Sequence, residues 1–160
     1  MSKKQTLYME TTEIPADRTA AEISMLLVQA GATQINLEYK DQKIVGMHFA
    51  YPVDGHTVPF CLPVRVDPVF RVLNGRRPPE TWRQFNRQAM AAKDREQAER
   101  VAWRQLLRWI QAQIAMIDTG MVKTEEIFMP YIWSRSGRTL FEEFVRSGAL
   151  LQLPAPEAEA

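Results

Sequence analysis

The sequence predicts an α+β protein, in which an antiparallel β-meander with one packed helix (βαβββ-like) precedes a mostly α-helical C-terminal half. Two observations support this. Between residues 35 and 62, three short segments alternate apolar and polar residues and are separated by turn signals. From Glu80 to Thr119 there is no proline or glycine, and good helix formers predominate. The chain has 160 residues, of which 46% are hydrophobic and 24% charged, so we expect one domain or two small ones.

The N-terminal part predicts a weak strand and then a helix. Residues 7–14 alternate weakly, and Pro15 ends that run. Thr19 and Glu22 have the spacing of a capping box, in which each side chain satisfies the other's backbone N–H. Gly31 lies where the residue after a helix adopts a positive φ. The intervening apolar residues share one helical face: Ile23, Leu26, Leu27 and Ala30.

The meander is predicted from alternation and turn residues. Lys40–Lys43 is a polar turn, and Asp54-Gly55 is a strong hairpin signal because glycine tolerates a positive φ. Pro59 cannot donate to a ladder of hydrogen bonds, so the third strand is expected at an edge. The expected strands are 35–39, 45–51 and 58–62.

Helices are expected for the rest of the chain. Asp67-Pro68 and Asn74-Gly75 bracket a short helix, and a long helix ending near Thr119 is predicted to break at Lys93-Asp94. Two further short helices follow, the second opened by a Thr139–Glu142 capping box. Prolines 78 and 79 suggest a boundary, so we expect an α+β meander module at 1–75, a helical module packed on it at 76–153 and a disordered acidic tail at 154–160.

The total charge of +1 conceals three blocks. Residues 1–63 hold 5 basic and 7 acidic groups, residues 64–110 hold 11 and 5, and residues 111–160 hold 4 and 7. Ten of the eleven central bases are arginines, whose planar guanidinium suits phosphate or carboxylate. The asymmetry is therefore the first indication of function.

No pattern of residues specifies a catalytic chemistry. His48, His56 and Cys61 lack the spacing of a zinc site, and they are read as ordinary strand and turn residues rather than as a Cys–His nucleophile. The seven glycines are scattered singly, which argues against a phosphate-binding loop. We therefore expect no catalytic residue, no metal and no cofactor, while a carboxylate metal cluster built from remote segments is left open as a third possibility.

The arginines of the central block are the candidate functional residues. Several are spaced three or four apart on predicted helices, with aromatic residues beside them, and such rows can follow a phosphate backbone while bases stack. The alternatives are a solvated face of ordinary helix ion pairs and a surface for an acidic protein. The residues predicted to contact nucleic acid are Arg76, Arg77, Arg83, Arg87, Arg100, Arg104 and Arg108, with Trp82 as a stacking residue.

Parts of the chain resemble small uncharacterised proteins encoded by tailed phages and prophages. The resemblance spans roughly residues 7–153, and its clearest stretches are Asp17–Ile23, Gly31–Thr33, Pro63–Asp67, Ala98–Arg104 and Phe128–Tyr131. It implies a bacterial host cytoplasm, and it implies DNA handling in replication or recombination, or else blockade of a host protein. A meander followed by a long helix is also similar to the core of phage strand-annealing proteins, which are oligomeric rings; this is an analogy of fold alone.

The sequence therefore predicts a non-enzymatic phage accessory protein that binds nucleic acid, with single-stranded DNA as the favoured ligand and a homo-oligomer as a further expectation. The alternative is a protein-binding module that inhibits a host defence or transcription protein. That module would use the arginines against an acidic surface, or an exposed aromatic patch of Phe128, Tyr131 and Trp133. No apolar run reaches the ~20 residues of a membrane span, and the N-terminus does not read as a signal peptide, so no membrane partner is expected.

Overall fold

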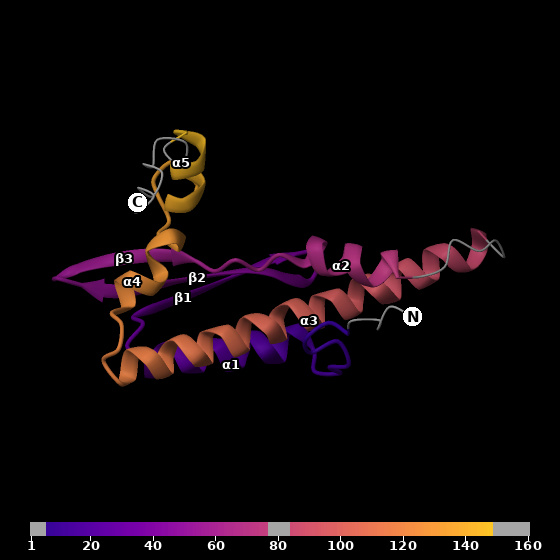
Figure 1. The fold of residues 1–160 in the computed structure, drawn as a ribbon, viewed down its shortest axis with the longest axis horizontal. Helices are drawn as coiled ribbons and strands as arrows, with labels where there is room; N and C mark the ends of the chain where they lie inside the picture. Colours follow the sequence, from indigo (N-terminus) through magenta and orange to yellow (C-terminus); the bar gives the residue numbers. More distant parts are fainter. Residues whose placement is uncertain (1–5, 77–83, 149–160) are drawn as a thin grey trace, which may run out of the picture.

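A computed structural model describes residues 6–76 and 84–148 as an α+β fold. Helix α1 precedes a three-stranded sheet, and helices form the C-terminal half (Figure 1). The elements are α1 (Ala16–Gln29), β1 (Gln34–Lys40), β2 (Lys43–Val53), β3 (His56–Cys61), α2 (Val66–Gly75), α3 (Gln84–Asp118), α4 (Thr124–Phe128), the 3-10 helix η1 (Met129–Tyr131) and α5 (Leu140–Arg146). The predicted fold class is confirmed.

The sheet is an antiparallel meander in the order β1-β2-β3. Asp41 and Gln42 have φ of 50° and 61°, and Asp54 and Gly55 have φ of 46° and 79°. Two successive residues of positive φ are the geometry of the tight hairpin turn that matches strand twist. Both turns therefore lie where the polar and Asp-Gly signals predict them. In the three-stranded sheet β3 is an edge strand, as Pro59 predicts, although an isolated bridge joins Phe60 to Ile132.

One face of the sheet forms the hydrophobic core. Phe49 and Phe60 are cross-strand partners, and their rings stack with centroids 5.0 Å apart. Helices α1 and α3 lie side by side along this face (Figure 1). Trp103 and Leu107 of α3 share one core with Ile23 of α1, so both halves of the chain contribute to it.

Two expectations for the N-terminal region are wrong. Residues 8–11 form a turn, not a strand. Thr19 does not cap a helix, because α1 already begins at Ala16 after Pro15, whose extended backbone (φ −59°, ψ 151°) serves as the start. Thr19 therefore falls within the helix, where its hydroxyl donates to the Pro15 carbonyl at 3.2 Å. The predicted helix end is confirmed, since Gly31 has φ 105°.

Helix α3 is continuous through Lys93-Asp94, so the expected break is also wrong. The N-terminal part of α3 is polar because it extends beyond the sheet, where α2 packs along it (Figure 1). The Arg95 guanidinium lies 4.6 Å from the Phe70 ring centroid of α2. Packing of α2 thus stabilises one continuous helix where the sequence predicts two.

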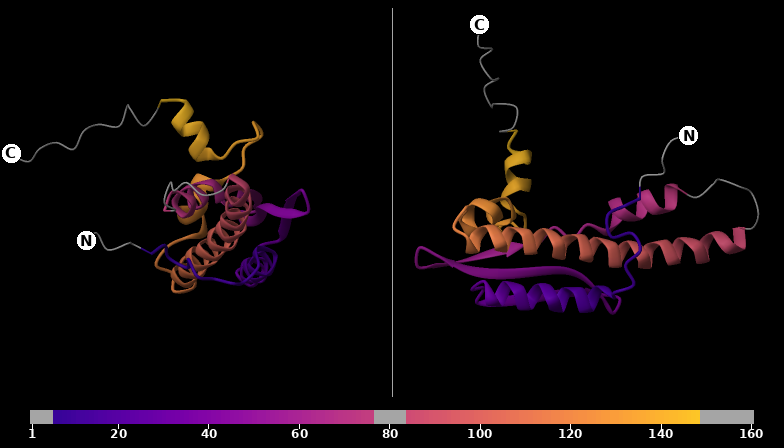
Figure 2. Two further views of the ribbon diagram at one scale, coloured as in Figure 1. Left: turned by 90° about the vertical axis from the view of Figure 1, so that its right-hand side faces the viewer. Right: turned by 60° about the horizontal axis from the view of Figure 1, so that its bottom comes forward.

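The C-terminal segment crosses to the other side of the sheet. Trp133 N–H donates to the Pro59 carbonyl at 2.8 Å, and the chain then enters α5, which projects away from the body of the molecule (Figure 2). The Thr139–Glu142 capping box is confirmed at its start, and Gly148 has φ 73° after its end. The boundary expected at Arg76–Pro79 and the tail expected at 154–160 fall largely or wholly outside the described residues.

Candidate nucleic-acid interface

The arginines of the predicted row do not share one surface. The Arg104 side chain is only 10% exposed, and its Nη1 donates to Glu22 Oε2 at 2.9 Å. The same nitrogen lies 3.4 Å from the Thr19 hydroxyl. Arg104 therefore joins α3 to α1 inside the fold, and this position removes it from the phosphate-contacting role that the spacing predicts.

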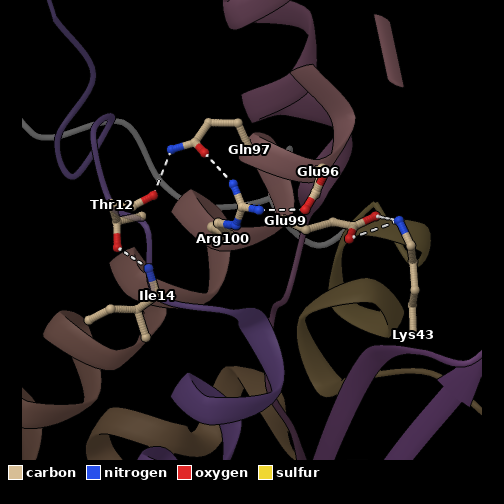
Figure 3. Close-up of polar contacts among 7 residues, drawn as sticks. All are labelled: Thr12, Ile14, Lys43, Glu96, Gln97, Glu99 and Arg100. Atoms are coloured by element: carbon tan, nitrogen blue, oxygen red, sulfur yellow. Dashed lines mark hydrogen bonds and ion pairs between the residues drawn. The ribbon is translucent and has the colours of Figure 1, made fainter. Parts of the chain in front are cut away.

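Two further arginines of the predicted set are paired with carboxylates. Arg100 donates to Glu96 on the preceding turn and to Gln97 at 3.0 Å, as Figure 3 shows. Gln97 in turn donates to the backbone carbonyl of Thr12 at 2.9 Å. Arg76 donates to Glu10 at 2.7 Å. These arginines hold the N-terminal segment and the helix surface in place, which is the ordinary role of helix charges named among the alternatives.

The remaining predicted residues divide into two groups. Arg87 and Arg108 are exposed, and Arg108 donates to Gln111 at 3.0 Å. Arg77, Trp82 and Arg83 lie outside the described residues. The three arginines of the predicted row therefore differ in burial. Arg100 is half-buried beside Glu96, Arg104 is buried between α3 and α1, and Arg108 is exposed.

A second set of arginines lines a hollow between β3, η1 and α5. The hollow has a volume of about 490 Å³. Its positive groups are Arg65, Arg138 and Arg146, all exposed, and its aromatic groups are Tyr131, Trp133 and Phe141. The other lining residues are Cys61, Leu62, Pro63, Val64, Gly137, Thr139 and Glu142.

A smaller hollow of about 280 Å³ adjoins the first. Both are lined by Pro63, Arg65 and Tyr131, so they meet at these residues. The smaller one adds Trp109, whose ring makes an edge contact with Tyr131 at 5.5 Å between centroids. We call the two together the basic–aromatic groove. It brings Arg65 and Arg146, which are 81 positions apart, into one depression with aromatic rings from the segments between them.

The negative groups beside the groove are held by a helix cap, by a serine and by one groove arginine. Glu142 accepts a hydrogen bond from the Thr139 backbone N–H at 2.8 Å, as part of the helix cap. Glu143 accepts from the Ser136 hydroxyl, which lowers the pKa of that carboxyl, and Arg138 lies 3.7 Å from it. The charge of Arg146 also acts on Glu143 and lowers the pKa of that carboxyl. Neither Arg65 nor Arg146 forms a direct ion pair with another of the described residues. The groove therefore keeps an excess of positive charge.

Cys61, His48 and Glu38 lie next to one another across the outer face of the sheet. His48 is the cross-strand partner of Cys61, and His48 Nε2 lies 3.0 Å from Glu38 Oε1. Burial, and after it the carboxylates of Glu38 and Glu142, raises the pKa of the Cys61 thiol. A nucleophilic cysteine needs the opposite shift, because the thiolate is the reactive form. Within the described residues no group of His, Cys, Asp and Glu has the arrangement of a metal site.

The groove arginines escaped the sequence analysis because they are isolated along the chain. Arg65 belongs to the central block but to no helical row, and Arg138 and Arg146 lie in the acidic third block. The aromatic patch predicted for the protein-binding alternative is partly correct as a guide to the groove, because Tyr131 and Trp133 line it. Phe128, the third residue of that patch, is 2% exposed and belongs to the core.

Comparison of the chain with protein-family models, curated proteins and solved structures finds no match. Over the residues that the structure describes, every helix is too short or too polar to cross a bilayer.

Proposed function

We propose that this protein is a non-enzymatic nucleic-acid-binding protein and that it takes single-stranded DNA in the basic–aromatic groove. One observation carries the proposal: exposed arginines and partly exposed aromatic rings line the same depression. Arginine donates to phosphate oxygens, and aromatic rings stack on bases, which is the combination that single-strand-binding grooves use. The resemblance to phage proteins suggests a place in replication or recombination.

The shape of the groove favours an unpaired strand. The bases of a duplex are stacked inside and present only their edges, so rings within a depression reach a base face only when that base is unpaired. Trp133 is oriented by the His48 ring, with centroids 5.0 Å apart and planes at 84°. Held in this way, the indole loses little further freedom when a base stacks on it.

Anisotropy of a fluorescent deoxythymidine oligonucleotide tests the proposal. We expect binding at low salt that weakens linearly on a logarithmic plot against salt, with a slope set by the number of phosphates contacted. A duplex of the same length is expected to bind more weakly. Absence of any affinity for the single strand at low salt would refute the proposal.

Charge-matched variants locate the site. Arg65→Gln combined with Arg146→Gln is expected to weaken binding by about tenfold or more at low salt and to flatten the salt slope by about 2. The control is Arg18→Gln with Arg71→Gln, which removes the same charge from exposed positions outside the groove. A third pair, Arg87→Gln with Arg108→Gln, tests the exposed part of the predicted row. Loss of binding in the third pair alone would move the site to α3.

A protein partner is the second candidate, and α5 favours it. Leu140, Phe141, Phe144 and Val145 of this seven-residue helix are each at least 39% exposed. Their spacing places them on one side of the helix. A host defence or transcription protein that copurifies with the chain after nuclease treatment, and is lost with Phe144→Lys, would support this function. It would not depend on Arg65 or Arg146.

A further inference from the structure

Strand β1 is an open edge of the sheet. Its recorded partner among the described residues is β2 alone, and the side chains of β1 other than Ile35 are exposed. An edge strand presents backbone N–H and C=O groups on the side away from its neighbour, and these can pair with another strand. The edge is seven residues long, Gln34–Lys40, which is longer than an average strand.

The apolar side of β1 is incompletely covered. Leu37 is the cross-strand partner of the buried Met47, so it lies on the core face of the sheet, yet it is 36% exposed. Tyr39, the partner of Ile44, is 63% exposed. Ile35 packs against the core. The core face of β1, the edge strand, is therefore only partly covered by the helices that pack on the rest of the sheet.

The sequence of β1 is compatible with pairing to itself. A register shift lies between Glu38 and Tyr39, so the regular part of the edge is Gln34–Glu38. In an antiparallel pair centred on Asn36, the Ile35 of each copy faces Leu37 of the other, and Gln34 faces Glu38. Moving the centre to Glu38 would place two carboxylates opposite each other, which is unfavourable. The net charge of +1 adds little repulsion between two copies.

We propose that a second copy of this chain pairs antiparallel with β1 through Gln34–Glu38, so that two sheets join into one of six strands. The pairing satisfies the open backbone edge and covers Leu37 on the core face. It leaves the basic–aromatic groove free, because that groove lies beside β3 and α5 at the other edge. The dimer would therefore present two grooves.

Sedimentation equilibrium of the full chain over a range of concentrations tests the interface. We expect the mass of two chains, and Leu37→Lys is expected to raise the dissociation constant about tenfold or more, because it places a charge in the paired face of both copies. Val72→Lys is the matched control, since Val72 is an exposed aliphatic residue of α2. Circular dichroism checks that both variants remain folded. A single-chain mass at every concentration would overturn the proposal.

A crosslink tests the register independently of affinity. In a Cys61→Ser background, Asn36→Cys places two cysteines opposite each other at the two-fold axis, within the reach of a disulfide. Oxidation is expected to yield a covalent dimer rapidly. Gln34→Cys, two residues away on the same face, faces Glu38 of the other copy and is expected to crosslink slowly. Equal rates for the two variants, or a dimer that persists in Leu37→Lys, would contradict this arrangement.

Discussion

Arg100 and Arg104 of α3 have surroundings opposite to those of Arg65 and Arg146 in the basic–aromatic groove. Arg104 and Arg100 lie beside Glu22 and Glu96, and their guanidinium groups are used within the fold. Arg65 and Arg146 are exposed in a hollow, and Glu142, the acidic residue that lines it, is held by its own helix cap. Regularly spaced arginines thus have structural roles at Arg100 and Arg104, and an irregular set lines the hollow that we propose as the binding site.

Arginine therefore has two roles in this protein: ion pairing within the fold and, in the proposed function, contact with phosphate. An arginine beside a carboxylate must exchange that partner for a phosphate before it can bind nucleic acid, and the exchange reduces the net gain. An arginine without such a partner exchanges only water and counterions. Substitutions in both sets of arginines, and labelling of the groove, test this difference.

Arg104→Ala is expected to lower the free energy of unfolding by about 2 kcal/mol, because it leaves the Thr19 and Glu22 side chains without their buried donor. The cost is below that of a fully buried pair, since the Glu22 side chain is 38% exposed and can be hydrated. Urea denaturation measures the change. Arg146→Gln is the comparison variant, with an expected change within about 0.5 kcal/mol. Equal destabilisation by the two would remove the distinction between the two sets.

Trp133→Ala is expected to weaken binding of a single-stranded oligonucleotide about tenfold, because a stacked base contributes roughly 1–3 kcal/mol. Trp133→Phe retains an aromatic face and is expected to restore part of the affinity. The anisotropy titration described above measures both. Circular dichroism serves as the control, because the Trp133 ring also contacts His48. Unchanged affinity in a folded Trp133→Ala variant would count against stacking in the groove.

Cys61 is the single cysteine and lines the groove, so its alkylation reports occupancy. Because burial and then Glu38 and Glu142 raise the pKa of the thiol, the iodoacetamide rate is expected to reach half its maximum above pH 9.0, the ordinary value. Saturating single-stranded DNA is expected to slow the reaction several-fold. A half-maximum below pH 9.0, or no protection by DNA, would contradict this prediction.

The Arg95–Asp67 pair is expected to contribute the smallest effect, and it depends on pH. The hydrogen bond and the charge of Arg95 lower the pKa of Asp67 below its ordinary value of 3.8. The stabilisation is therefore present above pH 3.8 and is lost as the pH falls through the lower, folded-state pKa. Denaturation of Arg95→Gln and of the unsubstituted protein should converge as the pH falls, apart from the contact with Phe70. A constant difference would show that the ion pair contributes nothing.

Local patterns predicted much of the fold. The alternation over β2 and the Asp54-Gly55 turn are consequences of neighbouring residues, and so is the Thr139–Glu142 cap. The cap expected at Thr19 and the break expected at Lys93-Asp94 are wrong, because Pro15 starts α1 early and α2 supports the polar part of α3. The strand expected at residues 7–14 is also wrong, because residues 8–11 form a turn. Local propensity is overridden where a distant segment packs.

The fold class, the two hairpin turns and the acidic and basic blocks are all predictable from the sequence, since each of these depends on residues close together in the chain. Which arginines are buried beside carboxylates and which are exposed depends on contacts between distant segments. Arg104 meets Glu22, 82 positions away, whereas Arg65 and Arg146 reach the same hollow from opposite ends of the helical half. Two charges pair when they lie close together in space. The spacing of residues along one helix cannot predict which distant carboxylate will lie beside an arginine.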